Sequence, residues 1–212
     1  MVTGTADTAP TPLNLNTDGN VKYVTMPRLA IKDTLEGRQT VPAWEVFTSA
    51  VDDLEAGSDF KTIVVDLLED VYDYARMYIC DKRGWEHESD DSFKAYEICR
   101  NEFLRTMRRL LNLPYNIILI SHEDTSKDIT KRGGDKTTAI KPNIADKVAT
   151  KLAGMVDIVL RAEKDGDEYT LSTKTNSVIF GGGRLTGLKA NDIPNTWDAI
   201  EAMYSVTGVP KV

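Results

Sequence analysis

The chain has 212 residues, of which 41% are hydrophobic, and this fits one compact domain with a full core. Its formal net charge of −7 excludes a protein that coats polyanions with its whole surface, so contact with nucleic acid would need a local basic patch. Cys80 and Cys99 are the only cysteines. This favours a reduced intracellular protein over a disulfide scaffold. The sequence shows neither a signal-peptide pattern nor an apolar stretch of membrane-spanning length.

Hydrophobic periodicity predicts alternating strands and helices along the chain. Strands are predicted over 12–16, 62–65, 117–120, 156–162 and 169–174, and helices over 42–54, 68–82, 92–112, 142–152 and 196–205. Residues 21–26 are expected to form a short strand or a sheet edge, and residues 123–141 a polar, lysine-rich loop. This alternation predicts an α/β fold with a mostly parallel sheet and a late antiparallel hairpin.

Two of the predicted strands end in polar residues. One apolar run ends at Asp66, and another ends in the pair Ser121 and His122. Ligands of open α/β sheets lie beyond the carboxyl ends of the strands, so these side chains are expected to meet in one crevice. An apolar run followed by Asp is the Walker B pattern, in which the carboxylate holds Mg²⁺ in P-loop NTPases. A buried strand followed by a helix N-cap gives the same pattern, and this is the alternative for Asp66.

A Walker A loop, G-x-x-x-x-G-K-[ST], is absent from the 212 residues. That loop cradles phosphates with backbone N–H groups and a lysine. The glycines at 133–134 and 181–183 lack the required spacing to a Lys-Thr pair. The sequence therefore argues against nucleotide hydrolysis by this chain as written. A flavodoxin-like or Rossmann-like domain is disfavoured as well, because no glycine-rich turn follows the first strand.

In order and spacing, five segments of the chain resemble phage P-loop nucleotide-binding proteins, the RecA-like ATPases of phage recombination modules. They are Leu-Asn-Leu-Asn-Thr-Asp-Gly at 13–19, Thr-Ile-Val-Val-Asp at 62–66, Ile-Ile-Leu-Ile-Ser-His-Glu at 117–123, Val-Asp-Ile-Val at 156–159 and Phe-Gly-Gly-Gly-Arg at 180–184. The resemblance implies a single RecA-like domain with a three-layer sandwich fold.

In that family a Walker A loop and its helix precede the strand that here is 13–16. Residues 4–10 resemble the end of that helix, so the P-loop strand is expected to be missing and residues 1–12 to be flexible or a remnant. A missing internal strand would leave unpaired backbone groups, and we expect rearranged or intermolecular pairing there, or an incomplete chain.

The resemblance implies ATP and Mg²⁺ as cofactors and suggests roles for several residues. Asp66 would hold a Mg²⁺-bound water, and Ser121 would contact the cofactor. Asp18 would be the general base, with Glu69 as a second candidate, and His122 would sense the γ-phosphate. The alternatives are a simple Asp-Gly turn for Asp18, a favourable helix-dipole interaction for Glu69 and an ordinary polar strand end for His122.

A basic segment follows the strand at 117–120, where RecA-like proteins carry a DNA-binding loop. Its cationic residues are Lys127, Lys131, Arg132, Lys136 and Lys141. A mobile basic loop suits contacts with the phosphates of single-stranded DNA. The segment has no aromatic residue for base stacking, and a solvated loop is the alternative. Arg184 could be an arginine finger that reaches a neighbouring subunit, or only the end of a hairpin.

Two functional hypotheses follow. The first is a phage recombination or replication accessory that binds ATP and single-stranded DNA, with an incomplete ATP site and ATPase activity left open. Its expected partners are single-stranded DNA, recombination or single-strand-binding proteins and further copies of the chain, in the cytoplasm of a bacterial host and without a membrane. The second is a non-catalytic RecA-like module that acts through protein or DNA contacts. A Walker A loop encoded upstream of Met1 would favour the first hypothesis, and its absence from the gene the second.

Overall fold

The computed structural model describes residues 3–19, 24–91, 94–126, 128–130, 136–175, 179–185 and 191–206. They form two compact units, one of Pro10–Ile120 and one that combines Met1–Ala9 with Ser121–Val212. Within the described ranges, no helix is both long and apolar enough to cross a membrane. That the chain behaves as a single domain stays a prediction.

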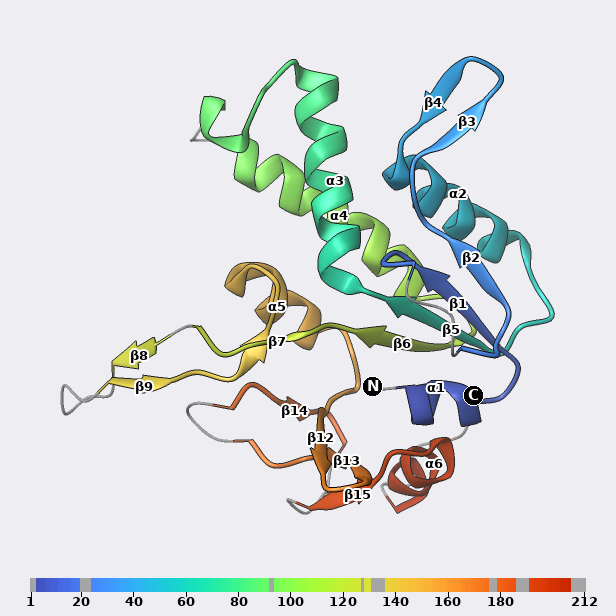
Figure 1. Ribbon diagram of the computed structural model, residues 1–212, viewed down its shortest axis with the longest axis vertical. Coiled ribbons are helices and arrows are strands. Elements are labelled where there is room, and N and C mark those ends of the chain that lie inside the picture. The colour runs from blue at the N-terminus through green and yellow to red at the C-terminus, as the bar shows by residue number, and fades with distance from the viewer. Residues whose placement is uncertain are drawn as a thin grey trace. The chain divides into compact units, whose positions relative to one another are not determined.

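The unit Pro10–Ile120 is built on a parallel sheet of four strands in the order β2-β1-β5-β6 (Figure 1). These strands are β1 (Pro12–Asn16), β2 (Arg28–Ala30), β5 (Thr62–Asp66) and β6 (Asn116–Ile120). The β-branched residues at 63–65 are fully buried, as is typical of a strand inside a parallel sheet. The predicted α/β fold with a parallel sheet is thus confirmed.

Two features of this unit differ from the predictions. An antiparallel hairpin of β3 (Thr34–Glu36) and β4 (Gln39–Val41) was not predicted, because its strands are short and mostly exposed and lack an alternating apolar pattern. The strand expected at 21–26 instead occurs as β2 at Arg28–Ala30, while residues 20–23 lie outside the described residues.

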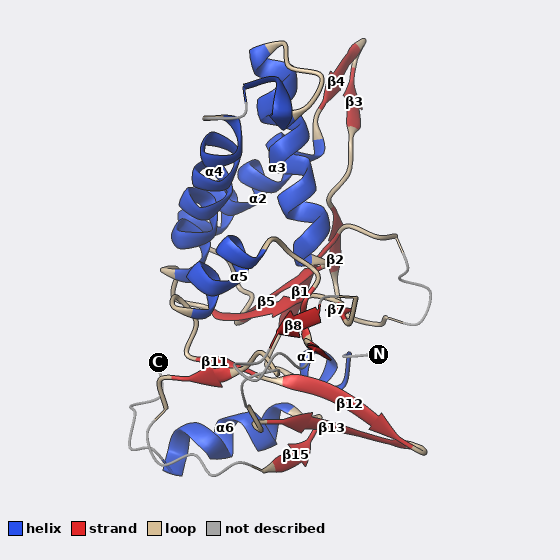
Figure 2. Ribbon diagram, turned by 90° about the vertical axis from the view of Figure 1, so that its left-hand side faces the viewer, coloured by secondary structure: helices blue, strands red, loops and turns tan. Residues whose placement is uncertain are grey.

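Helices α2 (Ala43–Ala56), α3 (Leu68–Arg83) and α4 (Ala95–Leu111) pack together on one face of this sheet (Figures 1 and 2). Their apolar faces meet in an aromatic cluster. Trp44 stacks on Phe47 at 5.6 Å between ring centroids, and Tyr72 meets Phe103 edge-on at 5.1 Å. Gly84 ends α3 with a φ of 67°, a left-handed conformation that glycine adopts without a steric penalty. These helices confirm the three that hydrophobic periodicity predicted over 42–54, 68–82 and 92–112.

Alkaline pH is expected to destabilise this unit through two buried groups. Burial, followed by the neighbouring Glu88 carboxylate, raises the pKa of the Cys99 thiol from 9.0 to about 12 and that of Tyr72 from 10.0 to about 12. The unfolded chain therefore loses these protons at a lower pH than the folded chain. The stability they contribute is complete below pH about 9 and is lost as the pH rises towards about 12.

Urea unfolding followed by circular dichroism between about pH 7.5 and about pH 10.5 checks this expectation, because the urea midpoint should fall across that range. The slope of this fall should be smaller in Cys99→Ala, which removes one of the two groups. A midpoint that does not change with pH in the native sequence would contradict the expectation.

The second unit contains α1 (Thr3–Thr8), α5 (Asp146–Ala153) and α6 (Trp197–Val206) together with short antiparallel strands. Its largest sheet has the order β12-β13-β15, formed by β12 (Arg161–Asp165), β13 (Glu168–Ser172) and β15 (Asp192–Pro194). The turn between β12 and β13 holds Gly166 at a φ of 59°, at the predicted position of the late hairpin. Leu171, Ile200 and Met203 are buried together between this sheet and α6.

The segment expected to be an irregular loop contains two antiparallel strand pairs. They join β7 (Glu123–Asp124) to β10 (Lys141–Pro142) and β8 (Asp128–Thr130) to β9 (Lys136–Thr138). The expectation of a loop without strands was wrong because cross-strand pairing, rather than an alternating pattern, determines these strands. The next helix begins at Asp146 and not at Pro142, because Pro142 is held in β10 opposite Glu123.

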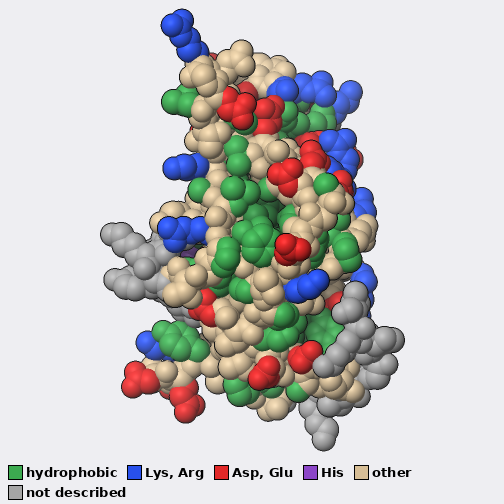
Figure 3. Space-filling view, turned by 90° about the vertical axis from the view of Figure 1, so that its right-hand side faces the viewer, with side chains coloured by type: hydrophobic (Ala, Val, Ile, Leu, Met, Phe, Trp, Pro, Cys, Tyr) green, Lys and Arg blue, Asp and Glu red, His purple; other side chains and the backbone are tan. Residues whose placement is uncertain are grey.

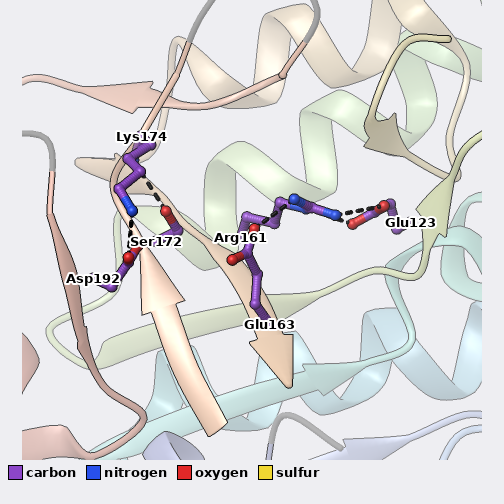
Figure 4. Close-up of polar contacts among 6 residues, drawn as sticks. All are labelled: Glu123, Arg161, Glu163, Ser172, Lys174 and Asp192. Atoms are coloured by element: carbon purple, nitrogen blue, oxygen red, sulfur yellow. Dashed lines mark hydrogen bonds and ion pairs between the residues drawn. The ribbon is translucent and has the colours of Figure 1, made fainter. Parts of the chain in front are cut away.

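Ion pairs line the antiparallel sheet of this unit (Figure 4). The Arg161 guanidinium binds Glu123 at 2.8 Å and Glu163 at 2.5 Å, and Lys174 pairs with Asp192. The Lys174 ammonium, followed by the Ser172 hydroxyl, holds the pKa of Asp192 below its ordinary value. All these charges are partly exposed, so each pair contributes little to stability.

A further antiparallel pair joins β11 (Ile158–Val159) to β14 (Gly182–Gly183). The backbones approach so closely here that a Cβ atom on Gly183 would lie 2.7 Å from the Asp157 carbonyl oxygen. The glycine run at 181–183 is therefore accounted for, at this position, by strand packing.

Candidate functional site

The carboxyl ends of three parallel strands meet at one edge of the sheet in the unit Pro10–Ile120. The register pairs Asn16 of β1 with Asp66 of β5, and Asp66 with Ile120 of β6. Asp66 is half-buried, and its carbonyl accepts a hydrogen bond from the Thr17 N–H at 2.8 Å. This edge is where open α/β sheets bind ligands, so Asp66 is the centre of the candidate site.

Thr17 connects the end of β1 to the beginning of α3. Its hydroxyl oxygen accepts a hydrogen bond from the Leu67 N–H at 2.7 Å and donates one to Asp70 Oδ2 at 2.7 Å. The Tyr74 hydroxyl donates to the Thr17 carbonyl at 3.4 Å. Leu67 occupies the N-cap position of α3 and has no side-chain acceptor of its own. The Thr17 hydroxyl therefore bridges the Leu67 N–H and the Asp70 carboxylate, which are the N-cap N–H and the N3 side chain that a capping box joins directly.

Asp18 follows Thr17 in an exposed turn. The Asn16 side chain closes this turn, because its amide donates to Asp18 Oδ1 at 3.0 Å and its oxygen accepts from the Gly19 N–H at 3.1 Å. Gly19 has a φ of 70°. The Asp-Gly turn that was the alternative for Asp18 is thus present. The Asp18 carboxylate lies two residues beyond Asn16, the register partner of Asp66.

Glu69 and Asp70 lie in the first turn of α3. Carboxylates are favourable there because the first turn of a helix carries partial positive charge. Glu69 is only 8% exposed, whereas Asp70 is half-buried and accepts the Thr17 hydroxyl. The helix-dipole alternative accounts for the positions of both residues.

Negative charge gathers around the Tyr74 hydroxyl. Burial first, and then the carboxylates of Asp70, Asp33 and Asp18, raise the pKa of Tyr74 above its ordinary value. Of these, Asp33 is engaged with the Ala43 N–H at 2.8 Å, next to the start of α2. The edge of the sheet is therefore an acidic environment rich in carboxylate oxygens.

Three other predicted residues belong to the second unit. The Ser121 hydroxyl donates to the His122 carbonyl at 3.2 Å, and that carbonyl also accepts the Asn143 N–H at 2.8 Å. The exposed Arg184 side chain donates to the Gly154 carbonyl. Ser121 and His122 directly follow β6 in the sequence but belong to the second unit. Of the predicted catalytic residues, Asp18 and Glu69 lie in the same unit as Asp66.

The predicted basic segment is described only in part. Lys127, Lys131 and Arg132 lie outside the described residues, and of Lys136 only the backbone, in β9, is described. Lys141 forms an ion pair with Asp146, with 3.1 Å between Nζ and Oδ2. Figure 3 shows acidic and basic side chains interspersed on one face of the molecule.

Thr17, Asp70 and Tyr74 were not among the predicted site residues. Thr17 and Asp70 are 53 positions apart, so no local motif joins them. The available signal was the pair of predicted strands at 12–16 and 62–65, because neighbouring parallel strands bring the residues that follow them to the same edge.

The parallel sheet and the helices packed on it form an α/β domain, an architecture consistent with that of P-loop NTPases. Residues 3–185 match the AAA domain family, a family of AAA-type P-loop ATPases. Because this match spans most of the sequence, the chain belongs to the AAA domain family. No curated protein and no solved structure matches the chain significantly.

Proposed function

We propose that this chain binds a nucleoside triphosphate together with Mg²⁺ at the carboxyl edge of its parallel sheet, and that Asp66 holds a metal-bound water. The observation that carries the proposal is the position of Asp66, which lies at the end of the buried strand β5 and is paired in register with Asn16 of β1. Membership of the AAA domain family supports a nucleotide as the ligand.

The carboxylate oxygens at this edge are suitable ligands for Mg²⁺. This ion prefers oxygen ligands and is commonly held by one or two carboxylates together with waters and substrate phosphates. Asp66 and Asp70 supply carboxylates at this edge. Among the described residues, no group of three or more His, Cys, Asp or Glu side chains could hold a metal ion, which is compatible with a site completed by water and phosphate. When bound, Mg²⁺ would neutralise charge on the phosphate oxygens.

Asp18 is the better candidate for orienting a water molecule. Its carboxylate is exposed, and the Asn16 amide fixes one of its oxygens at 3.0 Å. Glu69 is only 8% exposed in the first turn of α3, so water has less access to it. We therefore assign Asp18 the role of general base, with Glu69 as the second candidate.

The phosphate-binding side of the site has no Walker A motif in the 212 residues. The residues described above account for the metal-facing side, and we derive no hydrolytic step from them. His122 as sensor, Ser121 as a cofactor contact and Arg184 as an arginine finger remain parts of the proposal that await testing.

We further propose a contact with single-stranded DNA through the basic segment at 127–141, in a phage recombination or replication protein that forms homo-oligomers. The support is five cationic residues against two aspartates, Asp128 and Asp135, within 15 positions, in a chain whose formal net charge is −7. Electrostatic contacts of this kind weaken strongly as the salt concentration rises.

Calorimetric titration of the 212-residue chain with ATP tests the proposal, with Mg²⁺ or EDTA and with or without a single-stranded oligonucleotide. We expect micromolar binding that requires Mg²⁺. No binding of Mg²⁺-ATP under any of these conditions would overturn the nucleotide proposal. Salt-sensitive oligonucleotide binding would support the DNA contact, and its absence at low salt would overturn that part alone.

A further inference from the structure

We propose that Thr17 is a positioning residue, which fixes the Asp66 strand end and the Asp18 turn relative to each other and thereby sets the affinity for Mg²⁺-nucleotide. This inference rests on the proposed function and assigns a role to a residue that makes no contact with the reacting groups itself. Its basis is the set of hydrogen bonds that Thr17 forms at the carboxyl edge of the sheet.

Thr17 bonds both polar atoms of the peptide group that joins Asp66 to Leu67. Its N–H donates to the Asp66 carbonyl at 2.8 Å, and its hydroxyl oxygen accepts from the Leu67 N–H at 2.7 Å. Two bonds to a single peptide group restrain both its position and its orientation. The backbone that carries the Asp66 carboxylate is therefore held directly by the end of β1.

The proton of the Thr17 hydroxyl points towards the Asp70 carboxylate. The hydroxyl donates to Asp70 Oδ2 at 2.7 Å, and a hydrogen bond to a charged acceptor is stronger than one between neutral groups. Because this proton points at Asp70, a lone pair of the same oxygen faces the Leu67 N–H. Asp70 thus orients the hydroxyl that orients the Asp66–Leu67 peptide.

Thr17 also precedes Asp18 directly, so its position affects both proposed functional carboxylates. The Tyr74 hydroxyl bonds the Thr17 carbonyl at 3.4 Å, at the peptide group that leads into Asp18. A change that releases the Thr17 hydroxyl is expected to loosen the two strand ends together. Groups that orient the primary ligands of a metal typically contribute about 10-fold to about 100-fold to metal affinity.

The test compares Thr17→Val, which keeps the shape but removes the hydroxyl, with Thr17→Ser, which keeps the hydroxyl. Thr48→Val is the matched control, because the Thr48 hydroxyl donates to the Glu45 carbonyl within α2, at 3.0 Å and away from the strand ends. Circular dichroism establishes that each variant is folded. Amide hydrogen exchange of Leu67 is measured without ligand, and ATP affinity is measured with Mg²⁺ and with EDTA.

In Thr17→Val we expect exchange of the Leu67 amide to become faster and the Mg²⁺-dependent affinity for ATP to fall by about 10-fold to about 100-fold. Thr17→Ser and Thr48→Val should keep both properties of the native sequence. Faster exchange with unchanged Mg²⁺-dependent affinity would show that the Thr17 hydroxyl stabilises only the local structure, and this would overturn the inference. So would unchanged exchange in Thr17→Val, or lost affinity in a folded Thr17→Ser.

The same measurements separate this inference from the proposed function. A native chain that binds no Mg²⁺-ATP overturns the proposed function, and the positioning role falls with it. A native chain that binds Mg²⁺-ATP, with equal affinity in Thr17→Val, overturns the positioning role alone.

Discussion

Replacing Asp66 by asparagine is expected to remove the Mg²⁺-dependent part of ATP binding while the protein stays folded. The substitution keeps the shape of a half-buried side chain and the backbone bond from the Thr17 N–H, but it removes the negative charge at the end of β5. We expect the Mg²⁺-dependent affinity for ATP to fall by at least about 100-fold, because groups that only orient a metal ligand already contribute up to about 100-fold to metal affinity. Calorimetry with Mg²⁺ and with EDTA measures this effect.

Asp53→Asn is the matched control for this variant. Asp53 is exposed on α2 of the same unit, so the control makes the same chemical change away from the strand ends. Its ATP affinity should equal that of the native chain. Native affinity in a folded Asp66→Asn variant would exclude Asp66 as the metal-facing residue, and any turnover that the native chain shows must also be lost in this variant.

Removing the Arg76 side chain is expected to destabilise the unit Pro10–Ile120 severely. Glu88 is only 2% exposed, and its Oε2 pairs with Arg76 at 2.7 Å. Its other oxygen, Oε1, has no hydrogen-bond partner in the described part of the chain. Arg76→Met would leave a buried carboxylate without its cation, which typically costs about 3–5 kcal/mol of the free energy of unfolding.

Two comparisons make this second prediction specific. Arg105→Met removes a guanidinium that pairs with Glu102 but is 70% exposed, and its effect should stay within about 0.5 kcal/mol. Adding Glu88→Gln to Arg76→Met removes the buried charge and should recover part of the lost stability. Urea unfolding gives the free energies, and equal values for Arg76→Met and Arg105→Met would contradict the role of the buried pair.

Much of the fold follows from local sequence patterns. The buried strand at β5 and the helices α2, α3 and α4 were predictable, because each carries a strong periodicity over its own length. Residues 4–10 were expected to be the remnant of a helix or flexible. In the structure Thr3–Thr8 form α1, which contacts α6 in the second unit. Strands of two or three residues, such as those of β7 to β10, were not predictable, because their pairing partners rather than their own composition determine them.

The candidate site was predictable only as far as the chain order allowed. The rule for strand ends was applied to Asp66 and to the Ser121–His122 pair, whereas Asp18 was named from the resemblance. The register places Asp18 two residues beyond Asn16, the partner of Asp66. The rule could not identify the hydroxyl of Thr17 as the link to Asp70, because that contact depends on the exact register between β1 and β5. The roles of Ser121, His122, Arg184 and the basic residues stay predictions.

The second unit is closed by contacts between distant parts of the chain. Both the Thr5 N–H and its hydroxyl donate to Asn195 Oδ1, at 3.0 Å and 2.6 Å, and the Trp197 N–H donates to the Thr8 hydroxyl oxygen at 2.8 Å. Domains generally fold in the order in which the ribosome releases them. Residues 10–120 are synthesised well before residues near 195, and α1 cannot dock until those later residues are present. On the ribosome, this unit is therefore expected to be the last to form.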